Sequence, residues 1–189
     1  MVKSLREYSR DLIVTLESLD AKYINCVENV IELTVSCLKK GGKVMLAGNG
    51  GSAADAQHMA GEYVSRFMFD RPGLSAVALT TDTSILTAIG NDYGYNKLFT
   101  RQIEAIGRAG DVLMLYTTSG TSPNIVAAIE VACSMDITVV LLTSEKYVGN
   151  EHEGLLVLKV PNRSTPTVQE MHLVTGHYIC MRVESAIYG

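Results

Sequence analysis

The chain has 189 residues, of which 47% are hydrophobic and 19% charged, and its formal net charge is −4 at pH 7. This length suits one domain that buries about 70% of the surface exposed by its unfolded chain. The negative charge argues against a nucleic-acid-binding surface, which normally carries a basic stripe. The sequence contains no run of 18 apolar residues, so it predicts no membrane span. The four cysteines show no C-x-x-C spacing, so we expect buried thiols in a reducing, cytoplasmic compartment.

The hydrophobic pattern predicts alternating helices and strands. Residues 3–40 carry apolar positions at helical spacing and predict two helices, which are broken near 18–21 and closed by Gly41 and Gly42. Strands are expected at 44–47, 74–79, 111–116, 138–143 and 155–160, and helices at 52–69, from 83 through 89, and at 99–106, 125–135 and 168–188. Continuously apolar strands separated by helices predict a parallel sheet that is covered on both faces. The expected fold is an α/β three-layer sandwich, with a doubly wound parallel sheet and an N-terminal helical pair, in a single domain over 1–189.

A glycine-rich loop, Gly48-Asn-Gly-Gly-Ser52, separates the first strand from the next helix. Glycine permits left-handed backbone angles and the close approach of a ligand. We expect Ser52 to cap the helix, whose positive N-terminal end attracts an anion. The spacing Gly48-x-Gly50-x-x-Ala53 also fits a degenerate dinucleotide fingerprint, but the acid that should end the next strand is missing. The loop therefore favours the phosphate of a small molecule.

A second candidate anion loop is Thr117-Thr-Ser-Gly-Thr-Ser122, which follows the third strand. Its five hydroxyls and the helix amides behind it can donate to phosphate oxygens. The alternative is a capped turn whose hydroxyls satisfy local amides. No G-K-[ST] follows, which excludes a nucleoside-triphosphate P-loop. Because ligands of open α/β sheets gather outside the carboxyl ends of the strands, both loops are expected to face one crevice.

Two helices carry a possible metal-ligating or catalytic set. His58 and Glu62 lie four residues apart on one helical face. On the last helix Gln169 and His177 fall about 80° apart, so one broad face can present both, with His172 on the other flank of Gln169. Imidazole, carboxylate and amide groups together suit zinc or a related divalent ion. From spacing alone, a structural histidine–glutamate pair remains the alternative, and His152 is given no role.

Several separated motifs resemble the phosphoheptose isomerases, which are sugar-isomerase (SIS) domain proteins. The motifs are Gly48-Asn-Gly-Gly-Ser-Ala-Ala-Asp-Ala-Gln-His58 with Glu62, Ala88-Ile-Gly-Asn-Asp92, Thr118-Ser-Gly120, and Val168-Gln-Glu-Met-His172 with His177. They occur in the family's order, and the resemblance runs from about residue 30 to residue 188. It implies conversion of sedoheptulose 7-phosphate to D-glycero-D-manno-heptose 7-phosphate through an enediol. That reaction is the first step toward heptose precursors for lipopolysaccharide or capsule.

The resemblance also implies an assembly and a set of site residues. It implies a homotetramer with active sites at subunit interfaces, in which helices 1–40 serve oligomerisation, and no nucleic-acid or membrane partner. It implies one zinc ion per subunit, with ligands His58, Glu62, Gln169 and His177. We expect Glu62 to shuttle the carbon-bound proton and His177 to serve the oxygens. The expected substrate-binding residues are Asn49, Gly50, Gly51, Ser52, Asn91, Asp92, Thr117, Thr118, Ser119, Ser122 and Gln169.

Departures from the family pattern leave rival functions open. Residues 144–150 replace the family's glycine-rich loop, and Thr167 stands where an arginine is common. A sister group acts as an adaptor that binds the bacterial replication initiator. It resembles this chain around Gln57-His58 but lacks the acid at position 62 and the histidine at position 177, so their presence here favours an enzyme. A sugar-phosphate sensor is a third candidate, but no basic helix-turn-helix segment flanks the domain.

Overall fold

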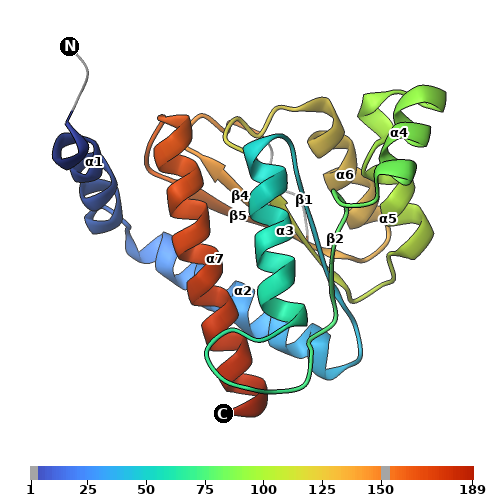
Figure 1. The fold of residues 1–189 in the computed structure, drawn as a ribbon, viewed down its shortest axis with the longest axis horizontal. Helices are drawn as coiled ribbons and strands as arrows, with labels where there is room; N and C mark the ends of the chain where they lie inside the picture. Colours follow the sequence, from blue (N-terminus) through green and yellow to red (C-terminus); the bar gives the residue numbers. More distant parts are fainter. Residues whose placement is uncertain (1–3, 150–153) are drawn as a thin grey trace.

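The computed structural model describes residues 4–149 and 154–189. Its helices are α1 (Leu5–Glu17), α2 (Ala21–Lys39), α3 (Gly51–Val64), α4 (Thr83–Asp92), the 3-10 turn η1 (Tyr95–Lys97), α5 (Thr100–Ile106), α6 (Pro123–Ser134) and α7 (Thr165–Tyr188). The strands are β1 (Val44–Gly48), β2 (Ala76–Ala78), β3 (Val112–Tyr116), β4 (Thr138–Ser144) and β5 (Leu155–Val160). Figure 1 shows α3 and α7 side by side in front of the sheet. His152 lies outside the described residues.

The described strands form one sheet in the order β2-β1-β3-β4-β5, and every neighbouring pair is parallel. The first strand, β1, is therefore the second from one edge of the sheet, with β2 on one side and β3, β4 and β5 on the other. Gly48, the last residue of β1, lies opposite Tyr116, the last residue of β3. The two loops expected to bind anions consequently leave the same edge of the sheet from adjacent strands.

Both faces of the sheet are covered, because successive residues of a strand point to opposite sides. Leu46 packs in a core cluster with residues of α2, α3 and α7. Met45 packs in a second cluster with residues of α4, α5 and α6. These two cores confirm the predicted three-layer α/β sandwich with a doubly wound parallel sheet.

Helix α1 projects from the body of the molecule (Figure 1). Leu12 and Leu16 pack against the larger core, and the Tyr8 hydroxyl donates to Glu170 of α7 at 2.8 Å. Leu5 and Val14 are instead exposed, at 80% and 57% of their full surface. The predicted use of residues 1–40 in oligomerisation stays a prediction, although an apolar helical face normally has a partner.

The helix predicted over 52–69 ends earlier, at Val64. Past that point the carboxylate of Glu184, in α7, accepts the backbone N–H groups of Phe67 and Met68 at 2.9 and 2.7 Å. Arg71 donates to the carbonyl of Tyr63 at 2.7 Å. Long-range partners therefore take the hydrogen-bonding groups that a longer helix would have used.

The strand predicted at 74–79 is shortened to Ala76–Ala78. The Leu74 amide donates to the carbonyl of Tyr63, at the end of α3, rather than to a neighbouring strand. Helices α6 and α7 begin two and three residues before their predicted starts, each with a proline in its first turn. Proline is tolerated there because the first amides of a helix have no intrahelical partner.

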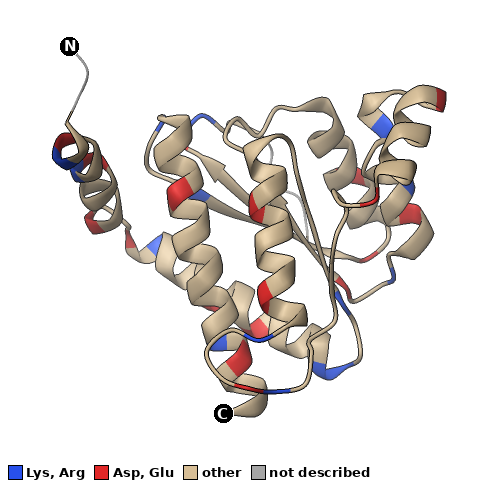
Figure 2. Cartoon of the chain, in the orientation of Figure 1, with Lys and Arg blue, Asp and Glu red and all other residues tan. Residues whose placement is uncertain are grey.

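Figure 2 shows acidic and basic residues interspersed along the helices. Among the described residues, no helix is both long and apolar enough to cross a bilayer.

Candidate active site

The first anion loop turns at Gly50, which has φ +58° and stands at the N-cap of α3. The prediction that Ser52 is the cap is therefore wrong: Ser52 is buried within the first turn of the helix, and the cap position carries no side chain. The left-handed backbone angle explains the difference, because glycine adopts it without strain. The Ser52 and Ala53 amides donate to the carbonyls of Asn49 and Gly50 at 3.1 and 3.0 Å, so among the first-turn amides it is that of Gly51 that is left for an anion.

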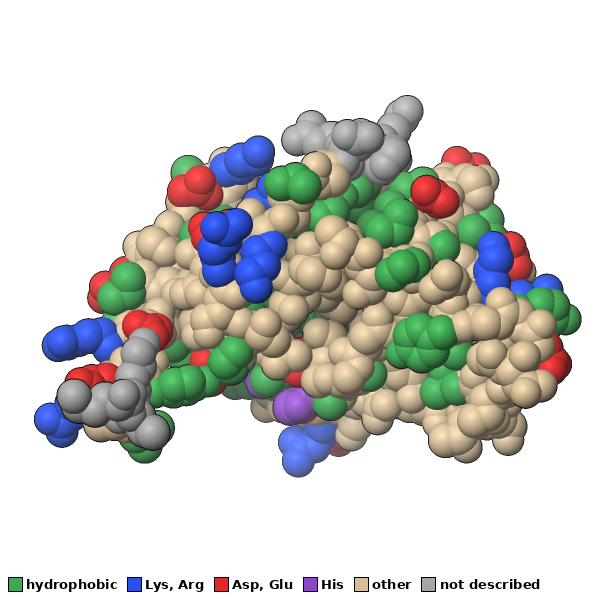
Figure 3. Space-filling model, turned by 90° about the horizontal axis from the view of Figure 1, so that it is seen from above, with side chains coloured by type: hydrophobic (Ala, Val, Ile, Leu, Met, Phe, Trp, Pro, Cys, Tyr) green, Lys and Arg blue, Asp and Glu red, His purple; other side chains and the backbone are tan. Residues whose placement is uncertain are grey.

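A pair of side-chain amides joins the first candidate anion loop to the start of α6, directly after the second loop. Asn49 and Asn124 donate to each other's side-chain oxygens, both at 2.9 Å. The hydroxyl of Tyr95 donates to the same Asn49 oxygen at 2.9 Å. This contact confirms that the loops after β1 and β3 lie side by side. Figure 3 looks onto the end of the molecule where α3, α6 and α7 begin, and the middle of that surface is mostly backbone and uncharged polar side chains.

The hydroxyls of the second loop are only partly engaged. Thr117 Oγ1 accepts the Gly120 amide at 3.1 Å, and Ser119 Oγ accepts the Thr121 amide at 3.3 Å. The alternative of a capped turn, in which hydroxyls satisfy local amides, thus applies to these two hydroxyl oxygens. Each hydroxyl can still donate its hydrogen to a ligand. Within the described residues, the hydroxyls of Thr118 and Ser122 have no hydrogen bond.

The segment after β4 braces this second loop. Ser144 Oγ donates to the carbonyl of Thr118 at 2.6 Å. The Tyr147 ring, 7% exposed, packs against the face of Gly120, where a Cβ would collide with it. Ser144 and Tyr147, which belong to the segment that departs from the family pattern, therefore contact the backbone of the candidate phosphate loop.

Gly120→Ala is expected to destabilise the fold by about 1–3 kcal/mol, because φ is +70° there and the methyl group would meet the Tyr147 ring. Urea unfolding measures the change, and titration with inorganic phosphate should show weaker binding. Gly90→Ala in α4, where a Cβ meets nothing within 4 Å, is the matched control. The control should gain about 0.5–1 kcal/mol from helix propensity, and equal behaviour of the two variants would contradict the packing argument.

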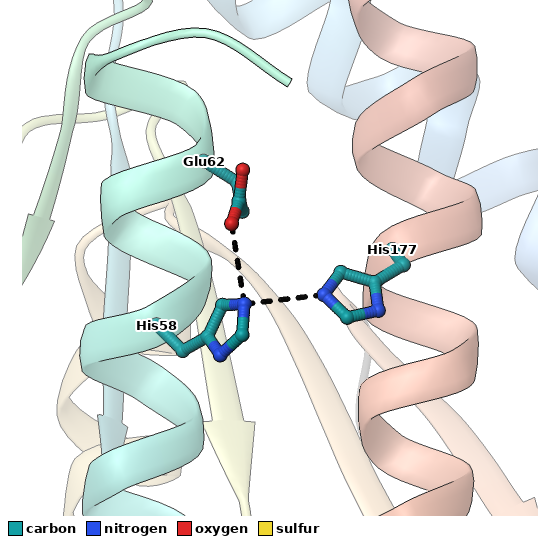
Figure 4. A group of neighbouring side chains, drawn as sticks. All are labelled: His58, Glu62 and His177. Atoms are coloured by element: carbon teal, nitrogen blue, oxygen red, sulfur yellow. Dashed lines mark hydrogen bonds and ion pairs between the residues drawn. The ribbon is translucent and has the colours of Figure 1, made fainter. Parts of the chain in front are cut away.

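Three side chains converge between α3 and α7, as Figure 4 shows. His58 Nε2 lies 3.2 Å from Glu62 Oε1 and 3.2 Å from His177 Nε2. The three candidate ligand atoms all lie within 4.8 Å of one another. The side chains of His58 and Glu62 are 47% and 25% exposed, so the cluster is open to a small molecule.

The chemistry of this cluster suits a cation. Only one proton can occupy the short gap between two imidazole nitrogens, and Glu62 adds negative charge. Burial lowers the pKa of His177, His58 acts in the same direction, and Glu62 opposes both. The neutral imidazole that results is the form that binds metal. Two imidazoles and one carboxylate are also a known ligand set of catalytic zinc.

Gln169 lies apart from this cluster in the single chain. It precedes His177 by eight residues, or about 12 Å along a helix. Its Nε2 is 2.6 Å from the position a Cβ would take on Gly51. The structure thus places Gln169 beside the first anion loop, which suits its predicted substrate contact, and its predicted metal ligation stays a prediction.

Two other predicted groups lie outside the cluster. Asn91 and Asp92 are exposed at the end of α4, joined by a 2.8 Å hydrogen bond, and within the described residues neither bonds to the anion loops. Their substrate role stays a prediction. His172 is fully buried, and burial lowers its pKa to about 4, so it is a neutral structural residue facing the carbonyl of Thr143.

Sequence reasoning missed Asp55, one turn before His58 on α3. Asp55 is 8% exposed, and its Oδ2 has no hydrogen-bond partner among the described residues. Burial raises the pKa of Asp55 to about 6, against the opposing effect of His58. The signal available in the sequence was that Asp55 precedes the candidate ligand His58 by three residues. That spacing does not reveal which face of the helix is buried.

Comparison with known proteins identifies the class of domain and the protein family. The family model described as SIS domain matches residues 7–144, so the chain from α1 through β4 belongs to the sugar-isomerase (SIS) domain class. The phosphoheptose isomerase of Burkholderia pseudomallei (strain 1710b) is 58% identical over 172 residues, which cover 90% of this chain and 86% of that protein. That of Aneurinibacillus thermoaerophilus is 52% identical over 171 residues, with 89% and 85% covered. The chain belongs to the phosphoheptose isomerase family, and it is an isomerase.

A solved structure agrees with this assignment. Phosphoheptose isomerase GmhA from Neisseria gonorrhoeae matches with a TM-score of 0.86 at 40% identity, and the match covers 94% of this chain and 95% of that one. The alternative of a non-enzymatic adaptor finds no support among these relatives.

Proposed function

We propose that the protein is an aldose–ketose isomerase that converts sedoheptulose 7-phosphate to D-glycero-D-manno-heptose 7-phosphate through an enediol. The observation that carries this proposal is the convergence of Glu62, His58 and His177 on one site, in a domain that also presents two anion loops. The relatives named phosphoheptose isomerase support the choice of substrate. The product serves as a precursor for the heptose of lipopolysaccharide or capsule.

Isomerisation moves one proton between neighbouring carbons and a second proton between their oxygens. We assign the carbon-bound proton to the Glu62 carboxylate and the oxygen-bound proton to the His177 imidazole. An imidazole nitrogen whose lone pair is engaged cannot also take up a proton. Either His177 ligates the metal only transiently, or a bound water carries part of the proton transfer. The anion loops hold the phosphate, which positions the reacting carbons.

The donor set in this chain fits zinc, as its two imidazole nitrogens and one carboxylate oxygen indicate. His58, Glu62 and His177 would hold the ion, and Gln169 is the fourth ligand that the family resemblance implies. Bound zinc supplies Lewis-acid polarisation of the substrate carbonyl.

The assembly and location proposed are a homotetramer in the cytoplasm, with active sites at subunit interfaces. The exposed apolar residues of α1 support an interface formed by residues 1–40. The four free cysteines support a reducing compartment.

The decisive experiment incubates the pure protein with sedoheptulose 7-phosphate and follows the formation of an aldose phosphate by NMR. We expect turnover. No turnover, together with tight binding to a replication initiator, would favour the adaptor instead.

Removal of divalent metal is expected to abolish turnover, and zinc is expected to restore it. The metal content of the purified protein should be one zinc per subunit, measured by plasma emission. His58→Ala should lower that content, while Gln57→Ala, the neighbouring exposed position on α3, should leave it unchanged. Activity that is indifferent to a chelator would remove zinc from the mechanism.

A further inference from the structure

The imidazole of His177 is held on one face by an aromatic ring. The Phe67 ring stacks on it with ring centroids 5.4 Å apart and an interplanar angle of 12°. His58 meets the same imidazole edge-on, with centroids 5.1 Å apart and planes at 62°. With Phe67 on its face and His58 at its edge, His177 directs Nε2 toward His58 Nε2, 3.2 Å away.

Phe67 is itself anchored to the helix that carries His177. It lies in the segment after α3, and its backbone N–H donates to Glu184 at 2.9 Å. Glu184 also pairs with Arg71 at 2.9 Å, and the side chains of the pair are 0% and 1% exposed. Glu184 follows His177 by seven residues, or two turns of α7. The backbone at Phe67 is therefore tied to α7, the helix that carries His177.

We propose that Phe67 is a positioning residue that holds the His177 imidazole in the orientation that aims Nε2 at His58 and Glu62. The geometry of this inference comes from the observed ring stack. Its consequence for catalysis rests on the proposed isomerase function. The torsion that turns an imidazole has a broad, roughly two-fold preference, so a half-exposed histidine needs a neighbour to fix its ring. The flat face of Phe67 supplies that neighbour, since it contacts the ring without competing for either nitrogen.

The test compares three variants of the full chain. Phe67→Leu removes the flat ring, whereas Phe67→Tyr keeps it. Phe69→Leu makes the same change two residues away, at a side chain of similar partial burial. Zn²⁺ affinity is measured by calorimetry at a temperature where near-ultraviolet circular dichroism shows every variant folded, and kcat and KM are measured with sedoheptulose 7-phosphate.

Phe67→Leu is expected to weaken Zn²⁺ binding by about 10–100-fold, the usual effect of losing support for a metal ligand. Its kcat should fall with little change in KM, while Phe67→Tyr and Phe69→Leu behave like the wild type. Wild-type zinc affinity and kcat in Phe67→Leu, or equal losses in Phe69→Leu, would overturn the proposal.

The same data separate the two proposals. A wild-type protein that binds zinc but does not turn over the sugar phosphate contradicts the proposed function, and zinc affinity then decides the role of Phe67. If the wild-type protein turns over the sugar phosphate without binding zinc, the role of Phe67 is decided by whether Phe67→Leu lowers kcat and leaves KM unchanged.

Discussion

Glu62→Gln is expected to lower kcat by about 10³-fold, within the range that a positioned general base contributes. The amide keeps the shape of the side chain but cannot accept the carbon-bound proton. The Glu62 side chain is 25% exposed, and among the described residues its one ion pair is with His58. Its loss should therefore change the free energy of unfolding by less than about 0.5 kcal/mol.

The measurement is turnover of sedoheptulose 7-phosphate, together with exchange of the substrate's carbon-bound hydrogen with deuterated water. Both should fall together in Glu62→Gln. Glu104→Gln, an exposed acid on α5 across the sheet, is the matched control and should leave both unchanged. A Glu62→Gln variant with near-normal turnover would refute the assignment of the base.

Arg71→Met is expected to destabilise the protein by about 3–5 kcal/mol, because it leaves the fully buried Glu184 carboxylate without its cationic partner. Urea unfolding provides the measurement. Arg163→Met breaks the exposed pair with Glu145 and should cost less than about 1 kcal/mol. The double variant Arg71→Met with Glu184→Gln should recover part of the loss. Equal costs for the buried and the exposed pair would contradict this account.

The same pair sets a pH dependence. Burial opposes ionisation of Glu184, but the backbone N–H groups of Met68 and Phe67 and the Arg71 guanidinium outweigh it and hold the pKa below its usual value. Such a carboxylate stabilises the fold above its unfolded pKa of about 4.3, and this stability is lost as the pH falls from there through the folded pKa. Glu184→Gln should remove that part of the slope between unfolding free energy and pH.

The sequence predicted the fold, because helical period and the alternation of strands and helices are local signals. The grouping of His58, Glu62 and His177 was implied by the family resemblance, since spacing alone also allowed a structural histidine–glutamate pair. The end of α3 was wrong, since Glu184 lies about 120 residues from the amides it accepts. The capping role of Ser52 was wrong, since only the backbone angle of Gly50 shows where the helix begins. The amide pair of Asn49 and Asn124 depends on side-chain orientation, which no periodicity encodes.

The location of the cluster within two packed helices has a consequence for heat inactivation. His58 and His177 sit in helix interiors whose neighbours, Met59 and Gly176, touch across the core. Their amides should be among the slowest to exchange hydrogen. The residues from Thr117 to Ser122 lie outside helices and strands, so we expect this loop to open at lower cost. On warming, the enzyme should therefore first lose affinity for its sugar phosphate, and lose its catalytic rate only when the whole domain melts.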